Sequence, residues 1–299
     1  MATFVTSDAH GHLRALDRAL ELAAPGADDI VYVLGDMIDR GPEPVGVLRF
    51  VRGMANARVL MGNHERMMLD ALFEPNPTNT LTWEMNRGTV TSDGLDALPR
   101  EEADGLIDWV ASLPLFDVVA VRDERPAAGA DARGLRAPEE RPERVYVLTH
   151  AGIDARRARA YLREHGAAEG EAGGYANVDL QLLRGMMEAQ DPEDLLWIRE
   201  EFWGAPTGLV GADGRGPVVL TGHTPSFYLD RFGATTCGDP RADQGMGRIF
   251  EVGACFDTGG EADRIDIDCA AAAGYPLGRV GVMRLEDRKI WYAEIEDGE

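Results

Sequence analysis

Five short apolar stretches of this sequence run directly into residues that can bind a metal ion or exchange a proton. Glycine stands beside most of these polar residues, so the backbone can turn sharply there and a small ligand can approach closely. Four of the six histidines of the chain belong to the set. Its members are Asp8, His10, Asp36, Asp39, Asn63, His64, His150 and His223.

Imidazole, carboxylate and amide oxygen are ligands that divalent transition metals accept. The set holds more such groups than one ion needs, which favours two ions that share a carboxylate. Two ions roughly 3.5–4 Å apart form a clamp suited to in-line displacement at phosphorus. Each histidine alone could instead be a core residue bound to carbonyl groups, and Asp36 alone could be a helix N-cap. Their joint occurrence after apolar stretches favours the metal site.

The apolar stretches themselves read as buried strands, because they are four or five residues long and rich in β-branched side chains. Helical patterns at residues 13–23 and 44–52 separate the first three, which predicts a parallel βαβαβ unit. We therefore expect an α/β fold whose polar residues lie at the carboxyl ends of the strands, where such sheets bind ligands. The five stretches are residues 3–7, 30–34, 57–61, 144–148 and 217–220.

The remainder of the chain predicts one catalytic domain over residues 1–299. Residues 64–119 read as mostly helical, with Trp83 among the core candidates. Residues 122–144 hold six Arg and six Asp or Glu and little that could be buried, which indicates a flexible insertion. Further β-like segments follow, at residues 248–255, 264–268, 278–285 and 290–295.

Charge and composition exclude several classes of function. The net charge of −22 disfavours binding to nucleic acid or to a membrane surface. Lys289 is the only lysine and is expected in an exposed turn, so P-loop, pyridoxal and protein-kinase chemistry lack their essential residue. Three cysteines without a CxxC spacing indicate neither a disulfide framework nor a zinc knuckle. No leader or spanning segment is recognised, so a cytoplasmic location is expected.

The polar residues also form a recognisable order of motifs. D-x-H-G, G-D-x-x-D-R-G, G-N-H-E, H-A-G and G-H-T-P follow one another from Asp8 to residue 225. This order resembles the calcineurin-like metallophosphoesterases, and within them the bacterial serine/threonine branch of the phosphoprotein phosphatase family. Residues 86–91, 195–202 and 256–259 are similar to segments of the same branch. The resemblance implies a four-layer α/β/β/α sandwich with a dinuclear metal site at the strand ends.

The resemblance also implies a role for each residue of the motifs. Asp36 would bridge the two ions, and a hydroxide between them would attack phosphorus directly. His64 would protonate the leaving group, Asp39 would orient His64, and Arg40 would bind the phosphate, helped by Asn63 and Arg199. Manganese is the expected metal, with iron or zinc as alternatives. The other implied ligands are Asp8 and His10 for the first ion, and Asn63, His150 and His223 for the second.

Three features depart from the family pattern, and the first is His12, which stands where many relatives carry Gln. Arg87 stands where glycine is common, and the family's second phosphate-binding arginine has no unambiguous counterpart. Arg199 is the candidate for that arginine, although it could equally pair with Glu200 or Glu201 on a helix face.

Three functions are weighed on this basis. The first is hydrolysis of phosphoserine or phosphothreonine in proteins. The second is hydrolysis of a small molecule such as a dinucleoside polyphosphate or a nucleotide, although relatives of that kind usually alter the Asp-Arg-Gly element that is intact here. The third is a metal-bound interaction module without activity, which the complete ligand set disfavours. The oligomeric state is left open.

Overall fold

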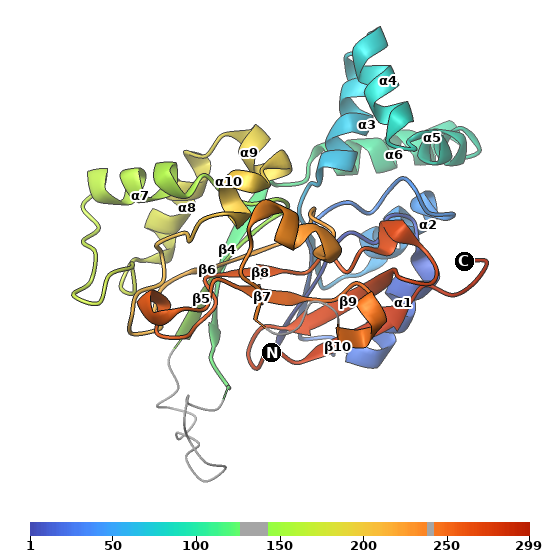
Figure 1. Ribbon diagram of the computed structural model, residues 1–299. Helices are drawn as coiled ribbons and strands as arrows, with labels where there is room; N and C mark the ends of the chain where they lie inside the picture. Colours follow the sequence, from blue (N-terminus) through green and yellow to red (C-terminus); the bar gives the residue numbers. More distant parts are fainter. Residues whose placement is uncertain (126–142, 238–241) are drawn as a thin grey trace.

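The computed structural model describes residues 1–125, 143–237 and 242–299, and its core is a pair of five-stranded β-sheets (Figure 1). The first sheet has the strand order β10-β9-β1-β2-β3, and the second has the order β4-β5-β6-β8-β7. The strands of the first sheet are β1 (Thr3–Thr6), β2 (Ile30–Val33), β3 (Ala57–Val59), β9 (Arg279–Arg284) and β10 (Ile290–Glu294). Those of the second are β4 (Phe116–Arg122), β5 (Glu143–Thr149), β6 (Val218–Thr221), β7 (Phe250–Val252) and β8 (Arg264–Asp266).

Alternate residues of the central strands face different layers, because side chains of a strand point to opposite faces of its sheet. On β2, Val31 and Val33 pack under the helices of the first sheet, whereas Tyr32 faces the second sheet. On β5, Val147 packs under the helices of the second sheet, whereas Tyr146 lies between the sheets. The two sheets therefore share an inner core, and each has a second core on its outer face.

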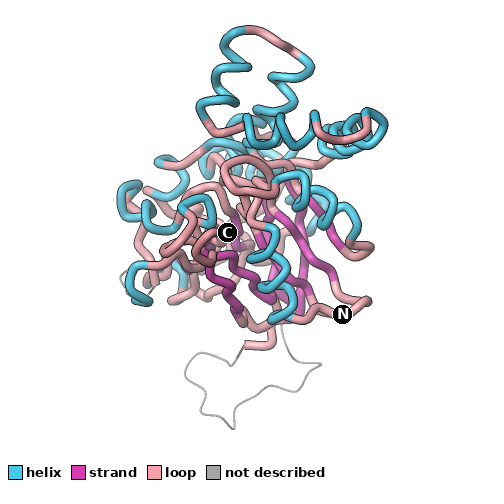
Figure 2. The backbone as a smooth tube through the Cα atoms, turned by 90° about the vertical axis from the view of Figure 1, so that its right-hand side faces the viewer, coloured by secondary structure: helices cyan, strands magenta, loops and turns pink. Residues whose placement is uncertain are grey.

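Helices cover both outer faces and complete four layers. The first sheet is covered by α1 (Leu13–Ala23) and α2 (Pro44–Gly53), and the second by α7 (Ala155–Glu164) and α8 (Leu180–Glu188). Figure 2 shows the strands in the interior and helices around them. The expected α/β/β/α architecture is confirmed. None of the helices in the described ranges is both long and apolar enough to cross a lipid bilayer.

Six strands run parallel to their neighbours within the two sheets. β1, β2 and β3 are parallel in the first sheet, as the βαβαβ pattern predicts. β5, β6 and β8 are parallel in the second sheet, whereas the pairs β1–β9, β9–β10, β4–β5 and β7–β8 are antiparallel. The hairpin turn between β9 and β10 carries Lys289, which is exposed as expected.

The predicted helical region is shorter than residues 64–119. It consists of α3 (Asn63–Phe73), α4 (Pro77–Met85), α5 (Thr89–Asp96) and α6 (Arg100–Ala111). β4 follows at Phe116, because this stretch pairs along its whole length with β5. The α3–α6 group lies beyond the strands at one end of the molecule (Figures 1 and 2). Of the expected insertion at 122–144, the ends belong to β4 and β5, and residues 126–142 lie outside the described residues.

Candidate active site

Five of the six parallel strands supply, at their carboxyl ends, the predicted metal ligands of one buried site. Asp8 and His10 follow β1, Asp36 follows β2, and Asn63 opens α3 just after β3, while His150 follows β5 and His223 follows β6. All six of these residues are buried. The structure thus brings together every residue that the sequence assigned to a metal.

Unusual backbone geometry marks the site. Twelve non-glycine residues of the described chain have φ between 43° and 68°, the left-handed region that disfavours side chains, and six of them are site residues. Backbone strain of this kind concentrates at functional sites. The six are Asp8, His10, Asp36, Asp39, Arg40 and His223. Gly222 lies so close to Asp8 that an added Cβ would overlap the carboxylate oxygen Oδ2.

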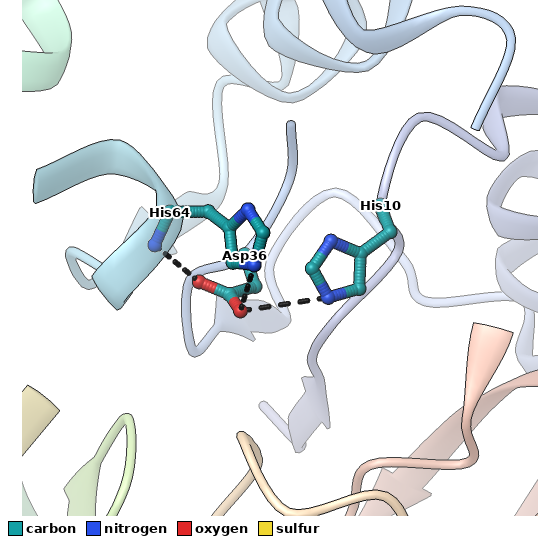
Figure 3. Close-up of side chains that lie close together, drawn as sticks. All are labelled: His10, Asp36 and His64. Carbon is teal, nitrogen blue, oxygen red and sulfur yellow. Dashed lines mark hydrogen bonds and ion pairs between the residues drawn. The ribbon is translucent and has the colours of Figure 1, made fainter. Parts of the chain in front are cut away.

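Backbone carbonyls orient two of the imidazole rings toward Asp36. The Nδ1 atom of His10 lies 2.9 Å from the carbonyl oxygen of Ile38, and the Nδ1 atom of His150 lies 2.7 Å from that of Leu34. Each ring therefore directs its Nε2 atom inward, at 3.5 Å from Asp36 Oδ2 for His10 and at 3.3 Å from Asp36 Oδ1 for His150. Figure 3 shows His10, Asp36 and His64 converging in this way. A second hydrogen bond that fixes the ring is typical of metal-binding histidines.

Two groups of potential ligands share the Asp36 carboxylate. One consists of His10, Asp36 and His64, and the other of Asp36, His150 and His223, with the ligand atoms of each group within 4.8 Å of one another. The amide oxygen of Asn63 faces the second group, at 2.8 Å from His150 Nε2 and 2.9 Å from His223 Nδ1. A position shared by two groups is what the expected bridging role of Asp36 requires.

Asp8 lies beside the first group rather than inside it. Both of its carboxylate oxygens accept a hydrogen bond from the backbone N–H of His223, at 3.1 and 3.0 Å. His64 takes the place in the first group that the sequence assigned to Asp8. Burial, together with the negative charges of Asp268 and Asp36, raises the pKa of Asp8.

The electrostatics of the site fit divalent cations. Burial raises the pKa of Asp36, and it lowers the pKa values of His10 and His223 and that of His150 to about 3. The imidazoles are therefore neutral, as metal ligands must be. Buried carboxylates that repel one another, facing neutral imidazole nitrogens, form a donor set that a divalent cation would stabilise. The residues present fit the two ions that the sequence predicts.

His64 lies between Asp39 and Arg40. Its Nδ1 atom is 2.6 Å from Asp39 Oδ2, and its Nε2 atom is 3.1 Å from an Nη atom of Arg40. Since a guanidinium only donates, His64 carries its proton on Nδ1 and donates it to Asp39. Burial and the charges of Arg40 and Arg199 lower the pKa of His64. The pairing of His64 with Asp39 that the sequence predicted is present.

Arg199 reaches the site instead of pairing on a helix surface. It lies between α9 (Pro192–Trp197) and α10 (Glu200–Trp203), and it donates to the carbonyl of His223 at 3.4 Å. No carboxylate of the described chain forms an ion pair with it. Arg199 also lines a cleft of about 630 Å³, together with the Trp197 and Phe232 side chains and several charged residues. This position is compatible with the phosphate-binding role predicted for Arg199.

The structure adds two residues at the end of β8 that the sequence did not suggest. Asp266 and Asp268 are both buried there, and burial raises the pKa of Asp268 to about 6. The negative charge of Asp268 acts on Arg199 and on Asp8. Applying the strand-end rule to the predicted segment at residues 264–268 would have found both residues.

Glu65 has a structural role that its motif alone did not reveal. Its carboxylate is fully buried and accepts hydrogen bonds from the backbone N–H groups of Asp36, Met37 and Gly62, at 2.8, 2.8 and 2.9 Å. The same side chain therefore ties the loop after β2 to the start of α3. Arg87, which replaces a common glycine, has φ 66° and so keeps the glycine-like backbone of that position.

Comparison with known proteins agrees with this site. Residues 1–254 match the family model of the calcineurin-like phosphoesterases. The chain is 32% identical over 155 residues to a symmetrical bis(5'-nucleosyl)-tetraphosphatase of Proteus mirabilis, covering 51% of this chain and 45% of that protein. A protein of the same name from Erwinia tasmaniensis is 30% identical over 171 residues, 55% of this chain and 50% of the relative. The matched stretch thus spans about half the length of these relatives.

A solved structure extends the likeness to the whole fold. The crystal structure of a candidate diadenosine tetraphosphatase covers 99% of this chain and 94% of its own, with a TM-score of 0.51 and 14% identity. At that identity the likeness concerns the fold alone. Because the family model covers most of the chain, the chain belongs to the calcineurin-like phosphoesterase family and is a metallophosphoesterase-type hydrolase.

Proposed function

We propose that this chain is a metal-dependent hydrolase of small phosphate compounds, with dinucleoside tetraphosphates as its first candidate substrates. The observation that carries the choice of substrate is the likeness of about half the chain to symmetrical bis(5'-nucleosyl)-tetraphosphatases. This likeness supports the small-molecule hypothesis better than the protein-phosphatase hypothesis.

Asp36 would be the shared ligand of two divalent ions. The first ion would also be held by Asp8 and His10 from the loop after β1. Such ions, when bound, activate water and stabilise charge on phosphoryl oxygens. The second ion would be held by Asn63, His150 and His223 together with Asp36.

The protein's own cations would bind and orient the phosphate. Arg40 and Arg199 both act electrostatically on His64, and each can donate several N–H groups to phosphate oxygens. A phosphate dianion bound between them would offset their charge, so the proton affinity of His64 would rise when substrate is present. His64 could then deliver a proton from Nε2 to the leaving oxygen while Asp39 holds its Nδ1–H.

Phosphoserine and phosphothreonine in proteins are a second candidate substrate, favoured by two observations. The contact of 2.6 Å between Asp39 and His64 supports a proton donor, which an alkoxide leaving group needs more than a nucleotide does. In addition, the cleft beside Arg199 is lined by six carboxylates and three arginines, which suits a basic peptide better than a polyphosphate.

One comparison of substrates distinguishes the two candidate functions. The purified chain with Mn²⁺ would be given diadenosine tetraphosphate or a phosphothreonine peptide with flanking arginines, and kcat/KM measured for each. We expect diadenosine tetraphosphate to be the better substrate and ADP to be its product. Turnover of the peptide alone would favour the second candidate, and turnover of neither would refute both. His64→Asn serves as the control that ties any activity to this site.

A further inference from the structure

The carboxylate of Asp39 is held by two side chains that no motif assigns to the site. Asp39 is fully buried, and its Oδ1 atom accepts a hydrogen bond from the Thr91 hydroxyl at 2.5 Å. The indole N–H of Trp83 lies 3.1 Å from both carboxylate oxygens. Trp83 belongs to α4 and Thr91 to α5, so neither comes from a strand end.

These contacts fix the direction in which Asp39 points. The Thr91 hydroxyl donates to Asp39 Oδ1 and also accepts from the backbone N–H of Asp39 at 3.0 Å. It therefore holds both the side chain and the backbone of Asp39. The Oδ2 atom is left facing His64 Nδ1 at 2.6 Å. Each oxygen of the carboxylate thus has a donor, and the carboxylate has no alternative orientation that keeps all of them.

The indole of Trp83 is itself locked in place. Trp83 is buried, and an added Cβ at Gly88 would overlap its ring. Gly88 follows Arg87, whose left-handed backbone turns the chain from α4 into α5. The turn between the two helices therefore closes around the indole and presents its N–H to Asp39.

Burial opposes the negative charge that Asp39 needs in order to hold His64. It raises the pKa of Asp39 to about 7, while the hydrogen bonds from Thr91 and Trp83 act in the opposite direction. Two donors aimed at a buried carboxylate stabilise its ionised form. Without them, the carboxylate would be free to rotate or to take up the proton that orients the imidazole.

We propose that Thr91 and Trp83 are positioning residues that hold the Asp39 carboxylate against His64 Nδ1 and so direct His64 Nε2 toward the leaving oxygen. The inference rests on the proposed role of His64 as proton donor and is independent of the choice between nucleotide and phosphoprotein. It makes the helices α4 and α5 part of the proton-transfer apparatus.

The test compares leaving groups on one enzyme preparation. Thr91→Val, which removes the hydroxyl at nearly constant shape, and Trp83→Phe, which removes the N–H, would be assayed on phenyl phosphate and on p-nitrophenyl phosphate with Mn²⁺. Phenolate needs a proton from the enzyme, whereas nitrophenolate leaves as a stable anion. We expect kcat on phenyl phosphate to fall about tenfold with KM unchanged, and kcat on p-nitrophenyl phosphate to fall much less.

The ratio of the two rates does not depend on the folded fraction, so a poorly folding variant still gives an answer. Thr91→Ser keeps the hydroxyl and is expected to restore the wild-type ratio. Thr207→Val is the matched control, because the Thr207 hydroxyl also donates to a buried carboxylate, that of Asp263, at 2.9 Å. Asp263 immediately precedes β8 and so lies at the strand end opposite the site. We expect this control to leave the ratio unchanged.

A double-mutant cycle separates the inference from its premise. In a His64→Asn background, Thr91→Val is expected to cause no further change in the ratio, since its effect passes through His64. Equal losses on both substrates, or a change in ratio that persists in the His64→Asn background, would overturn the inference. A normal ratio in His64→Asn itself would refute the proton-donor role and the inference together.

Discussion

Replacing Glu65 by Gln is expected to lower the free energy of unfolding and to weaken the metal centre. The carboxylate accepts from three buried backbone N–H groups, two at Oε2 and the N–H of Met37 at Oε1. A Gln side chain offers one acceptor oxygen, so its NH₂ group would face the N–H of Met37. One unpaired buried donor costs about 1–3 kcal/mol, and the two remaining bonds each lose about 1 kcal/mol of charge assistance. Relief of repulsion between Glu65 and Asp36 offsets part of this.

The net expectation is a loss of roughly 2–4 kcal/mol, measured by urea unfolding of the chelated protein. Glu286→Gln is the matched control, because both oxygens of Glu286 accept from the single N–H of Thr3, at 2.9 and 3.1 Å. One amide oxygen can serve that N–H, so the control should lose less than about 1 kcal/mol. We also expect Glu65→Gln, and not the control, to retain less metal on dialysis. Equal losses of stability in the two variants would refute the reasoning.

Three further predictions concern other parts of the chain. Asp36→Asn should lower both the metal content, measured by elemental analysis, and the activity; full metal content in this variant would contradict the shared ligand. Gly222→Ala should reduce metal retention because the added methyl group would overlap the Asp8 carboxylate, whereas Gly53→Ala, which meets nothing within 4 Å, should not. Burial acts to raise the pKa of Asp123, but hydrogen bonds from neighbouring arginines outweigh it and lower this pKa to about 2. Asp123→Asn should therefore reduce the free energy of unfolding at pH 7, with a deficit that shrinks between about pH 4 and pH 2; a deficit independent of pH would contradict the pairing.

The sequence predicted the strand ends well because a local pattern determines them. A short β-branched stretch followed by Gly and a ligand-type residue identifies a buried parallel strand, and parallel strands bring their carboxyl ends to one edge. His10 and His150 could be assigned to one site on this basis although they are far apart in the chain. The strand bounds differ from the predicted ones by a few residues at most, apart from residues 248–255, of which only Phe250–Val252 form β7.

The remaining parts of the site depend on contacts that no local pattern records. Asp268 belongs to a segment that the sequence predicts as β-like, but that β8 lies beside β6 is not visible from the order of the strands in the chain. Trp83 was expected in the core and is indeed buried. Its hydrogen bond to Asp39 could not be predicted, because the two residues belong to different elements of the fold. β4 was merged with the preceding helices, because seven residues that alternate only partly carry a weak strand signal.

The central claim is that residues from five strand ends hold two divalent ions that the hydrolysis requires. It is tested most directly by adding Mn²⁺ in steps to the chelated protein while activity on the preferred substrate and bound metal are both recorded. The account predicts no activity without metal and a maximum reached at two ions per chain. Full activity in the chelated protein, or a maximum at one ion per chain, would contradict it.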